Sequence, residues 1–349
     1  MSGASRGLSR RSLLSGAAAA TALGAVLLKD DLAARAVIPT SGQRESAAAA
    51  GEGQGGPIFV RHRTAPRRTA PMSRLNGGIQ VGVTLDMSAF PRSVTPQQAF
   101  RQWELATGCP PLATKIYFVR RQFPMRPPSK LAAAIARGMT AVLCYEPAFG
   151  PPSNHDAQAI TASLAALRRA GLRHACVVLY TEPQDQNTQL HVPEREFLEA
   201  FRFYAPAVRA SGWPVYYNAN SNPDTWAAYY PGDAHCDGVA VDDYARHYNW
   251  QDIWARGGIA RIADAAHKPF GWFEMGRYAS RDPAPLDVVA AYLSDATAYL
   301  ANRVKGGRPT GPVTWYNGNG GNSVIPLTLW PSNRLIAQRY YPAMYHALT

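Results

Sequence analysis

Short apolar runs that alternate with helical patterns are the feature of this sequence that most constrains its fold. Eight such runs follow one another toward the C-terminus; they begin near Ile79, Lys115, Ala141, Ala175, Pro214, Gly238, Pro269 and Pro312. Continuously apolar strands separated by helices are typical of a parallel sheet that is buried on both faces. Eight such units in residues 79–349 predict an α/β fold of the (β/α)8 type, a TIM barrel that forms a single domain.

An open, doubly wound sheet is the alternative arrangement of such units. That fold usually has a glycine-rich turn after its first strand, where the backbone receives a phosphate group. Here residues 86–90 follow the first run, and they contain neither a G-x-G-x-x-G motif nor a P-loop. The closed barrel is therefore the better prediction.

The N-terminal part has the pattern of an export signal and a linker. Arg10 and Arg11 precede an apolar stretch, rich in small residues, that ends at Leu28 and is short for a membrane span of about 20 residues. This pattern predicts a twin-arginine signal over residues 1–36, with an uncleaved anchor as the alternative. Residues 37–75, rich in Ser, Ala, Gly, Pro and Arg, predict a disordered basic linker. We therefore expect a catalytic barrel over residues 76–349, exported to the cell envelope or the extracellular space.

The net charge of +12 suggests a nucleic-acid partner until it is divided along the chain. Residues 1–36 carry a net charge of +3 and residues 37–75 carry +4, which leaves +5 for the remaining 274 residues. The barrel is thus only mildly basic, and no basic motif interleaved with aromatic residues occurs in it. We expect no nucleic-acid binding, although the linker would suit contact with an anionic cell envelope.

The four cysteines indicate neither a metal site nor a redox motif. They are Cys109, Cys144, Cys176 and Cys236, none forms a CxxC pair, and no histidine cluster has zinc-like spacing. We expect buried structural thiols, with a Cys144–Cys176 disulfide as an alternative if their strands are neighbours. The sequence predicts no metal and no cofactor.

Polar residues gather at the ends of the apolar runs, where the active site of a barrel lies. They are Asp86, Arg120, Glu146, Glu182, Asn218, Asp242, Asp243, Tyr244, Glu274 and the segment Trp315-Tyr316-Asn317. Long segments follow the fourth, seventh and eighth runs (183–192, 276–285 and 318–331), and long loops on one face usually carry function. Three glutamates that each directly follow an apolar run are not needed to build a barrel.

Two facing carboxyl groups can hydrolyse a glycosidic bond. One donates a proton to the leaving oxygen, and the other attacks the sugar carbon or activates water. Tyr180 and Trp272 stand two positions before Glu182 and Glu274, so strict alternation along a strand would place each on the face of its glutamate. Such an apolar wall would help to keep the acid protonated.

Four segments together resemble the clan-A glycoside hydrolases, which are retaining (β/α)8 enzymes, and in particular their mannanase-like subgroup. The segments are VVLYTEP (177–183), DGVAVDDY (237–244), KPFGWFEMG (268–276) and VTW (313–315). The resemblance implies that Glu182 is the acid/base and that Glu274 is the nucleophile. It also implies that Tyr244 contacts the nucleophile and that Trp315 forms the floor of the subsite for the reacting sugar. One position differs, because Thr181 stands where the family usually has Asn.

The predicted function is therefore an exported, cofactor-free, monomeric glycoside hydrolase that acts on a polysaccharide or oligosaccharide. The residues expected to bind the substrate are Asp86, Glu146, Thr181, Asn218, Asp243, Tyr244, Trp272 and Trp315. Two alternatives stay open. Thr181 favours a non-catalytic carbohydrate-binding barrel, whereas convergence of Asp86 with Glu146 would favour a muramidase-like cell-wall hydrolase.

Overall fold

The computed structural model describes most of the predicted barrel. It covers residues 79–119, 121–147, 150–183, 192–220, 225–245, 258–277, 285–317 and 331–349, all within one compact unit, Arg67–Thr349. The predicted signal and linker lie outside the described residues, as do Arg120 and most of the three long loops. Within the described ranges, no helix is long and apolar enough to cross a membrane.

Eight parallel strands form a nearly closed barrel, as predicted. They are β1 (Val81–Leu85), β2 (Ala113–Phe118), β3 (Thr140–Tyr145), β4 (Ala175–Leu179), β5 (Val215–Ala219), β6 (Gly238–Ala245), β7 (Phe270–Arg277) and β8 (Thr310–Asn317). The strand order is β1-β8-β7-β6-β5-β4-β3-β2. No strand pairing between β1 and β2 is found among the described residues. Two hydrogen bonds connect this edge of the barrel, from the Leu112 amide to the Val81 carbonyl (2.8 Å) and from the Lys115 amide to Thr84 Oγ1 (3.2 Å).

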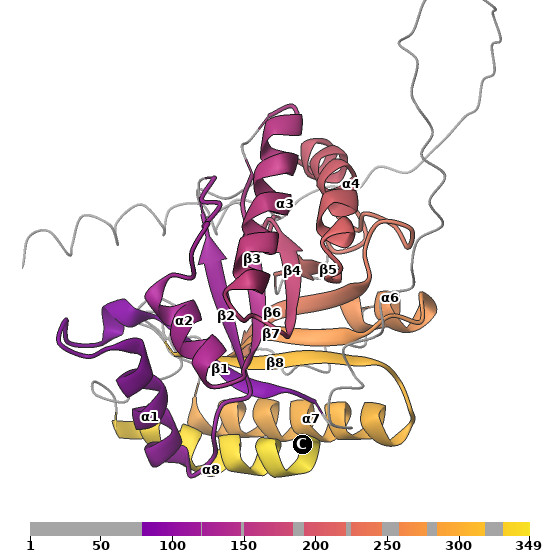
Figure 1. The fold of residues 1–349 in the computed structure, drawn as a ribbon. Helices are drawn as coiled ribbons and strands as arrows, with labels where there is room; N and C mark the ends of the chain where they lie inside the picture. The colour runs from indigo at the N-terminus through magenta and orange to yellow at the C-terminus, as the bar shows by residue number, and fades with distance from the viewer. Residues whose placement is uncertain are drawn as a thin grey trace, which may run out of the picture. The chain divides into compact units, whose positions relative to one another are not determined.

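Helices alternate with the strands and cover the outside of the barrel. They are η2 (Met87–Ala89), α1 (Pro96–Thr107), α2 (Ser129–Ala136), α3 (Asn154–Arg169), α4 (Glu194–Ala210), α6 (Ile259–Ala265), α7 (Leu286–Lys305) and α8 (Pro331–Leu348). Figure 1 shows α7 and α8 side by side along β8 and β1, while α3 and α4 lie side by side near β4. The outer helices thus shield the strands on the side away from the barrel axis.

Local sequence signals fix several helix ends. Thr95 caps α1, because its hydroxyl accepts from the Gln98 backbone amide while the Gln98 side chain accepts from the Thr95 backbone amide at 2.7 Å. Gly108 ends this helix with a φ of 74°, a left-handed conformation that suits glycine. Pro128 holds the N-cap position of α2 without a side-chain hydrogen bond, and Ser129 is the first helical residue, although a serine at this point of the sequence favours a capping role. The sequence also predicts a short helix near Trp226, where Thr225 is in 3-10 helical conformation and residues 226–229 form a turn.

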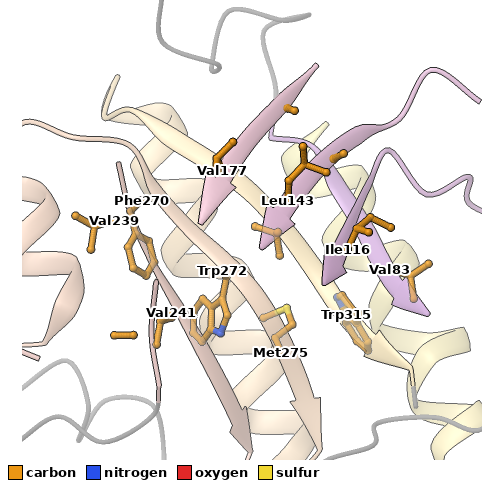
Figure 2. Close-up of a cluster of buried hydrophobic side chains, with 14 of the residues drawn as sticks. Val83, Ile116, Leu143, Val177, Val239, Val241, Phe270, Trp272, Met275 and Trp315 are labelled. Carbon is orange, nitrogen blue, oxygen red and sulfur yellow. The ribbon is translucent and has the colours of Figure 1, made fainter. Parts of the chain in front are cut away.

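Alternate residues of the strands divide the core into two parts. An outer layer fills the space between the strands and the helices, and Figure 2 shows part of it, including Val83, Leu143, Val241, Trp272 and Trp315. A smaller lumen cluster points toward the barrel axis; it consists of Val142, Cys144, Cys176, Val178, Tyr216, Ala240 and Phe273. The period of two along each strand therefore decides which side chains can reach the interior.

The four cysteines are buried free thiols. Cys144 and Cys176 lie on the neighbouring strands β3 and β4, so the condition for the alternative disulfide is met. They are nevertheless not opposite each other, because Cys144 is in register with Val178 and Cys176 with Val142. The prediction of structural thiols is confirmed for the bonding state, and the disulfide alternative is wrong.

An irregularity in β7 changes the alternation next to the predicted nucleophile. Trp272 pairs with Val241 and Glu274 pairs with Asp242, so Phe273 has no partner of its own on β6. Such a bulge inserts one residue and re-aims the side chains that follow it. As a result Phe273 lies in the lumen cluster, and the adjacent Glu274 also contacts groups inside the barrel.

Candidate active site

Glu274 is the centre of a polar cluster inside the barrel. Its carboxylate is buried in the C-terminal half of β7. Its Oε1 atom lies 3.4 Å from Lys115 Nζ, and its Oε2 atom accepts a hydrogen bond from the Tyr244 hydroxyl. Burial raises the pKa of Glu274, and the positive charge of Lys115 acts in the opposite direction. The two donors favour the ionised form that a nucleophile needs.

Lys115 links Glu274 to a second carboxylate. Its Nζ lies 2.5 Å from Asp242 Oδ2, and the Asn218 amide donates to the same oxygen at 2.9 Å. Burial works to lower the pKa of Lys115, but the charges of Asp242 and Glu274 outweigh it and hold the pKa well above its ordinary value. Lys115 is therefore an ammonium ion, and strands β2, β5, β6 and β7 all contribute to one charged network.

The chain leaves β4 through an unusual backbone conformation. Tyr180 and Glu182 have φ values of 57° and 48°, which place two non-glycine residues in the left-handed region on either side of the buried Thr181. Each such residue costs roughly 1–2 kcal/mol, and such strain tends to occur at functional sites. Burial raises the pKa of the Cys144 thiol to about 12, while Lys115 and the Thr181 hydroxyl act in the opposite direction.

Glu182 acts electrostatically on the same cluster. Burial raises the pKa of Tyr244 well above its ordinary value, and the negative charges of Asp242 and Glu182 raise it further. Burial likewise raises the pKa of Tyr316, with Glu274 and Glu182 among the contributing charges. The predicted acid/base and the predicted nucleophile therefore influence the same two tyrosines, whose rings meet edge to face at 6.3 Å.

Asp86 and Glu146, the acids that follow β1 and β3, differ in their contacts. Asp86 Oδ1 accepts from the Ser88 amide at 2.9 Å and from the Ser88 hydroxyl at 2.7 Å, so this carboxylate caps the short helix η2. Glu146 is buried after β3, and its charge is among those that raise the pKa of Cys144 and of Tyr180. The capping bonds give Asp86 a structural role, and its charge also acts on Tyr316 and Lys130, so the muramidase-like hydrolase stays an alternative.

Three predicted substrate-binding residues point away from the barrel axis, which corrects their placement. Trp272 packs edge to face on Tyr292 of α7 at 5.7 Å, because the bulge at Phe273 separates its face from that of Glu274. Trp315 packs edge to face on Tyr341 of α8, also at 5.7 Å, and donates to Met344 Sδ. Both tryptophans belong to the outer layer of Figure 2.

Asp243 is the third of these residues. It follows the inward-facing Asp242 on β6, and its charge acts on Tyr292 of α7, whose hydroxyl donates to the Asp243 carbonyl at 2.7 Å. Tyr180 is also turned outward, onto Phe197 of α4 at 6.1 Å, so it does not form the apolar wall expected beside Glu182.

Sequence reasoning missed two residues of the cluster. Lys115 was treated as the start of an apolar run, although a lysine inside a buried strand requires a paired acid. Tyr316 takes the inward position on β8 that was assigned to Trp315. In the structure Thr314 shares a hydrogen bond of 2.9 Å with Thr84 on the adjacent strand β1, and alternation along β8 gives Tyr316 the same face as Thr314.

The described residues offer no group of three or more His, Cys, Asp or Glu side chains that could hold a metal ion. The buried acceptors of the cluster that have no hydrogen-bond donor among the described residues include Asp242 Oδ1 and Asn218 Oδ1. Buried acceptors are normally paired, so a water molecule or a ligand hydroxyl would satisfy them. The predicted absence of a cofactor stays a prediction.

Comparison with known proteins relates the chain to glycoside-cleaving barrels at the level of the fold. The catalytic domain of a GH26 endo-β-1,4-mannanase from a Bacillus species matches with a TM-score of 0.51 at 15% identity, covering 77% of this chain and 86% of that one. A ruminal GH26 endo-β-1,4-mannanase matches with a TM-score of 0.49 at 11% identity, covering 77% and 64%. A GH128 endo-β-1,3-glucanase from Amycolatopsis mediterranei in complex with laminaritriose matches with 0.46 at 15% identity, covering 75% and 99%.

In sequence, no family model matches the chain, and no curated protein matches it. At 15% identity the match with the Bacillus mannanase domain concerns the fold alone, and the barrel itself is seen in the strand order of this chain. Both agree with the fold that the clan-A resemblance implied, and the chemistry has to be argued from the site itself.

Proposed function

We propose that this protein is a polysaccharide-cleaving glycoside hydrolase that works by a retaining mechanism. The observation that carries the proposal is the arrangement around Glu274, a buried carboxylate that receives a hydrogen bond from Tyr244 and an ion pair from Lys115. Glu182, which follows β4, affects Tyr244 and Tyr316 through its charge. Two carboxyl groups that share one polar centre are what glycoside hydrolysis requires.

The two glutamates take different roles because their surroundings differ. Glu274 is the nucleophile, since Lys115 and Tyr244 both stabilise its negative charge. Glu182 is half-buried and is the acid/base, which first protonates the leaving oxygen and then activates water. A retaining pair would have carboxyl groups about 5–5.5 Å apart. Thr181 replaces the usual Asn as a hydrogen-bonding partner for the sugar, and Tyr316 offers the aromatic surface next to the reacting sugar.

A β-1,4-linked mannan is the first substrate to test, because the catalytic domain of a β-1,4-mannanase matches this fold with a TM-score of 0.51. The unpaired acceptors of Asp242 and Asn218 also suit a ligand rich in hydroxyl groups or its bound water. We propose that the protein acts as a monomer outside the cytoplasm, exported by the twin-arginine signal of residues 1–36 and followed by the linker of residues 37–75.

A glycan panel tests the proposal. The purified protein would be incubated with β-mannan, glucomannan, laminarin and peptidoglycan, and new reducing ends would be measured. We expect cleavage of at least one β-linked glycan, lowered by about 10²- to 10⁴-fold in Glu182→Gln. A protein that binds one of these glycans but releases no reducing ends, with equal affinity in Glu182→Gln and Glu274→Gln, would be a carbohydrate-binding barrel instead.

A further inference from the structure

Lys115 lies between two carboxylates that belong to neighbouring strands. Asp242 on β6 and Glu274 on β7 are in register, so their charges face the same space inside the barrel. The Lys115 ammonium group lies 2.5 Å from Asp242 Oδ2 and 3.4 Å from Glu274 Oε1. The Lys115 and Asp242 side chains are fully buried, and that of Glu274 is 6% exposed. One cation is therefore shared by two acids, and it is closer to Asp242.

Like charges at such a site cannot both persist without compensation. The ammonium group favours the ionised form of each acid, and its effect on each falls with distance. Asp242 holds it more tightly, and the Asn218 amide adds a second donor to the same Asp242 oxygen. Glu274 thus receives only part of the stabilisation that Lys115 could provide.

We infer that Lys115 and Asp242 are positioning residues with opposite effects on the ionisation of Glu274. Lys115 promotes the carboxylate form of Glu274, and Asp242 limits that effect by holding the ammonium group on its own side. In the proposed hydrolase, on which this inference rests for its functional meaning, the pair sets the pH below which the nucleophile becomes protonated.

Other titratable groups interact with this pair and remain constant in the test. They are Cys144, Cys176, Glu182, Tyr244, Tyr316, Lys130 and Tyr117, whose ring centroid lies 5.0 Å from Lys115 Nζ. Cys144 is a neutral thiol near neutral pH, since burial raises its pKa to about 12. Because none of these groups is changed, a shift seen in a variant of Lys115 or Asp242 comes from the pair.

Carboxyl ¹³C NMR on the full chain, labelled at the glutamate δ-carbon, measures the ionisation of Glu274 directly. The Glu274→Gln variant identifies the signal, and its chemical shift is followed against pH. In Lys115→Met we expect the pKa of Glu274 to rise by about 1–3 units, because the carboxylate loses its cation. In Asp242→Asn we expect the pKa to fall, because the ammonium group becomes free to pair with Glu274.

Two further variants are controls for loss of the fold in Lys115→Met. Lys115→Arg keeps the positive charge and should leave the Glu274 pKa near its wild-type value. Lys115→Met/Asp242→Asn removes the buried pair as a whole, which is often tolerated, and its pKa should fall between those of the single variants. Circular dichroism confirms that each variant is folded. If Lys115→Met does not fold, the fall in Asp242→Asn remains decisive.

Shifts of the Glu274 pKa in the same direction in both single variants, or no shift in Asp242→Asn, would overturn the inference. The NMR titration needs no substrate, so it separates this outcome from failure of the proposed hydrolase. If the Glu274 pKa shifts in opposite directions but no glycan is cleaved, the inference about the charge arrangement stands and the proposed hydrolase fails.

Discussion

The two faces of strands β6 and β7 carry similar residue types that make different contacts. Toward the barrel axis lie Asp242, Tyr244 and Glu274, which join Lys115 in one charged network. Toward helix α7 lie Asp243 and Trp272, which pack around Tyr292. An acid and an aromatic residue thus join a charged network on one face and pack against a helix on the other, and a shift of one position separates the two.

Carboxylates on the two faces give the largest expected contrast. Glu274→Gln should lower kcat/KM by about 10⁴-fold or more, since an amide cannot act as the nucleophile. Asp243→Asn, a matched acid-to-amide change on the outward face, should keep the wild-type kcat/KM. Initial rates on the glycan that the panel identifies measure both. Equal losses in the two variants would contradict the division of the faces.

Aromatic residues on the two faces of β8 give the next contrast. Trp315→Ala should lower the free energy of unfolding by about 3–5 kcal/mol, because it leaves a cavity against Tyr341 and Met344. Urea unfolding measures this loss, and kcat/KM of the folded fraction should stay near wild type. Tyr316→Ala should instead lower kcat/KM strongly. A Trp315 variant that is stable but inactive would restore Trp315 to the site.

The hydrogen bond from Tyr244 to Glu274 offers a smaller test within the inward face. Tyr244→Phe removes a donor to a charged group, a loss of about 1.5–3 kcal/mol, so kcat/KM should fall by roughly 10- to 100-fold. The donor favours the carboxylate, so its removal should raise the Glu274 pKa further. Activity is lost as pH falls through that pKa, so the acidic limb of the pH–rate profile should move to higher pH. An unmoved limb would show that the bond does not act on ionisation.

The bulge itself can be tested at Gly271. A Cβ atom there would lie 2.6 Å from the Phe273 ring and 3.1 Å from the Pro312 carbonyl. Gly271→Ala should therefore cost about 1–3 kcal/mol of stability by displacing Phe273 and, next to it, Glu274. Thermal unfolding and kcat/KM should both decline. Full activity in a destabilised variant would mean that the position of Glu274 does not depend on Phe273.

Apolar runs and the helical patterns between them were enough to predict the barrel, because continuously apolar strands that alternate with helices are typical of a parallel sheet. They also predicted that Glu182 and Glu274 would share one end of the barrel. The patterns failed where the backbone departs from regularity. The extra residue at Phe273 separated Trp272 from Glu274, and the left-handed Tyr180 turned its ring onto Phe197. Such departures depend on contacts between strands, which one sequence does not reveal.

Lys115 was missed for a different reason. Lys115 begins a mostly apolar run. The acids that balance its charge, Asp242 and Glu274, lie on strands β6 and β7, more than a hundred residues later in the sequence. Only the closed barrel brings them together. A buried charge in a predicted strand is therefore a useful signal in itself, since it requires a partner on another strand.

Covalent trapping tests the central claim most directly, namely that Glu182 and Glu274 form a retaining pair. A 2-deoxy-2-fluoro glycoside of the sugar that the panel identifies slows hydrolysis of the covalent glycosyl-enzyme, so that this intermediate accumulates. Peptide mass spectrometry then locates the labelled residue. We predict one sugar on Glu274, on a peptide that includes Phe270–Arg277, and persistence of this adduct in Glu182→Gln. Labelling of another residue, or release of an inverted product without any adduct, would contradict the assignment.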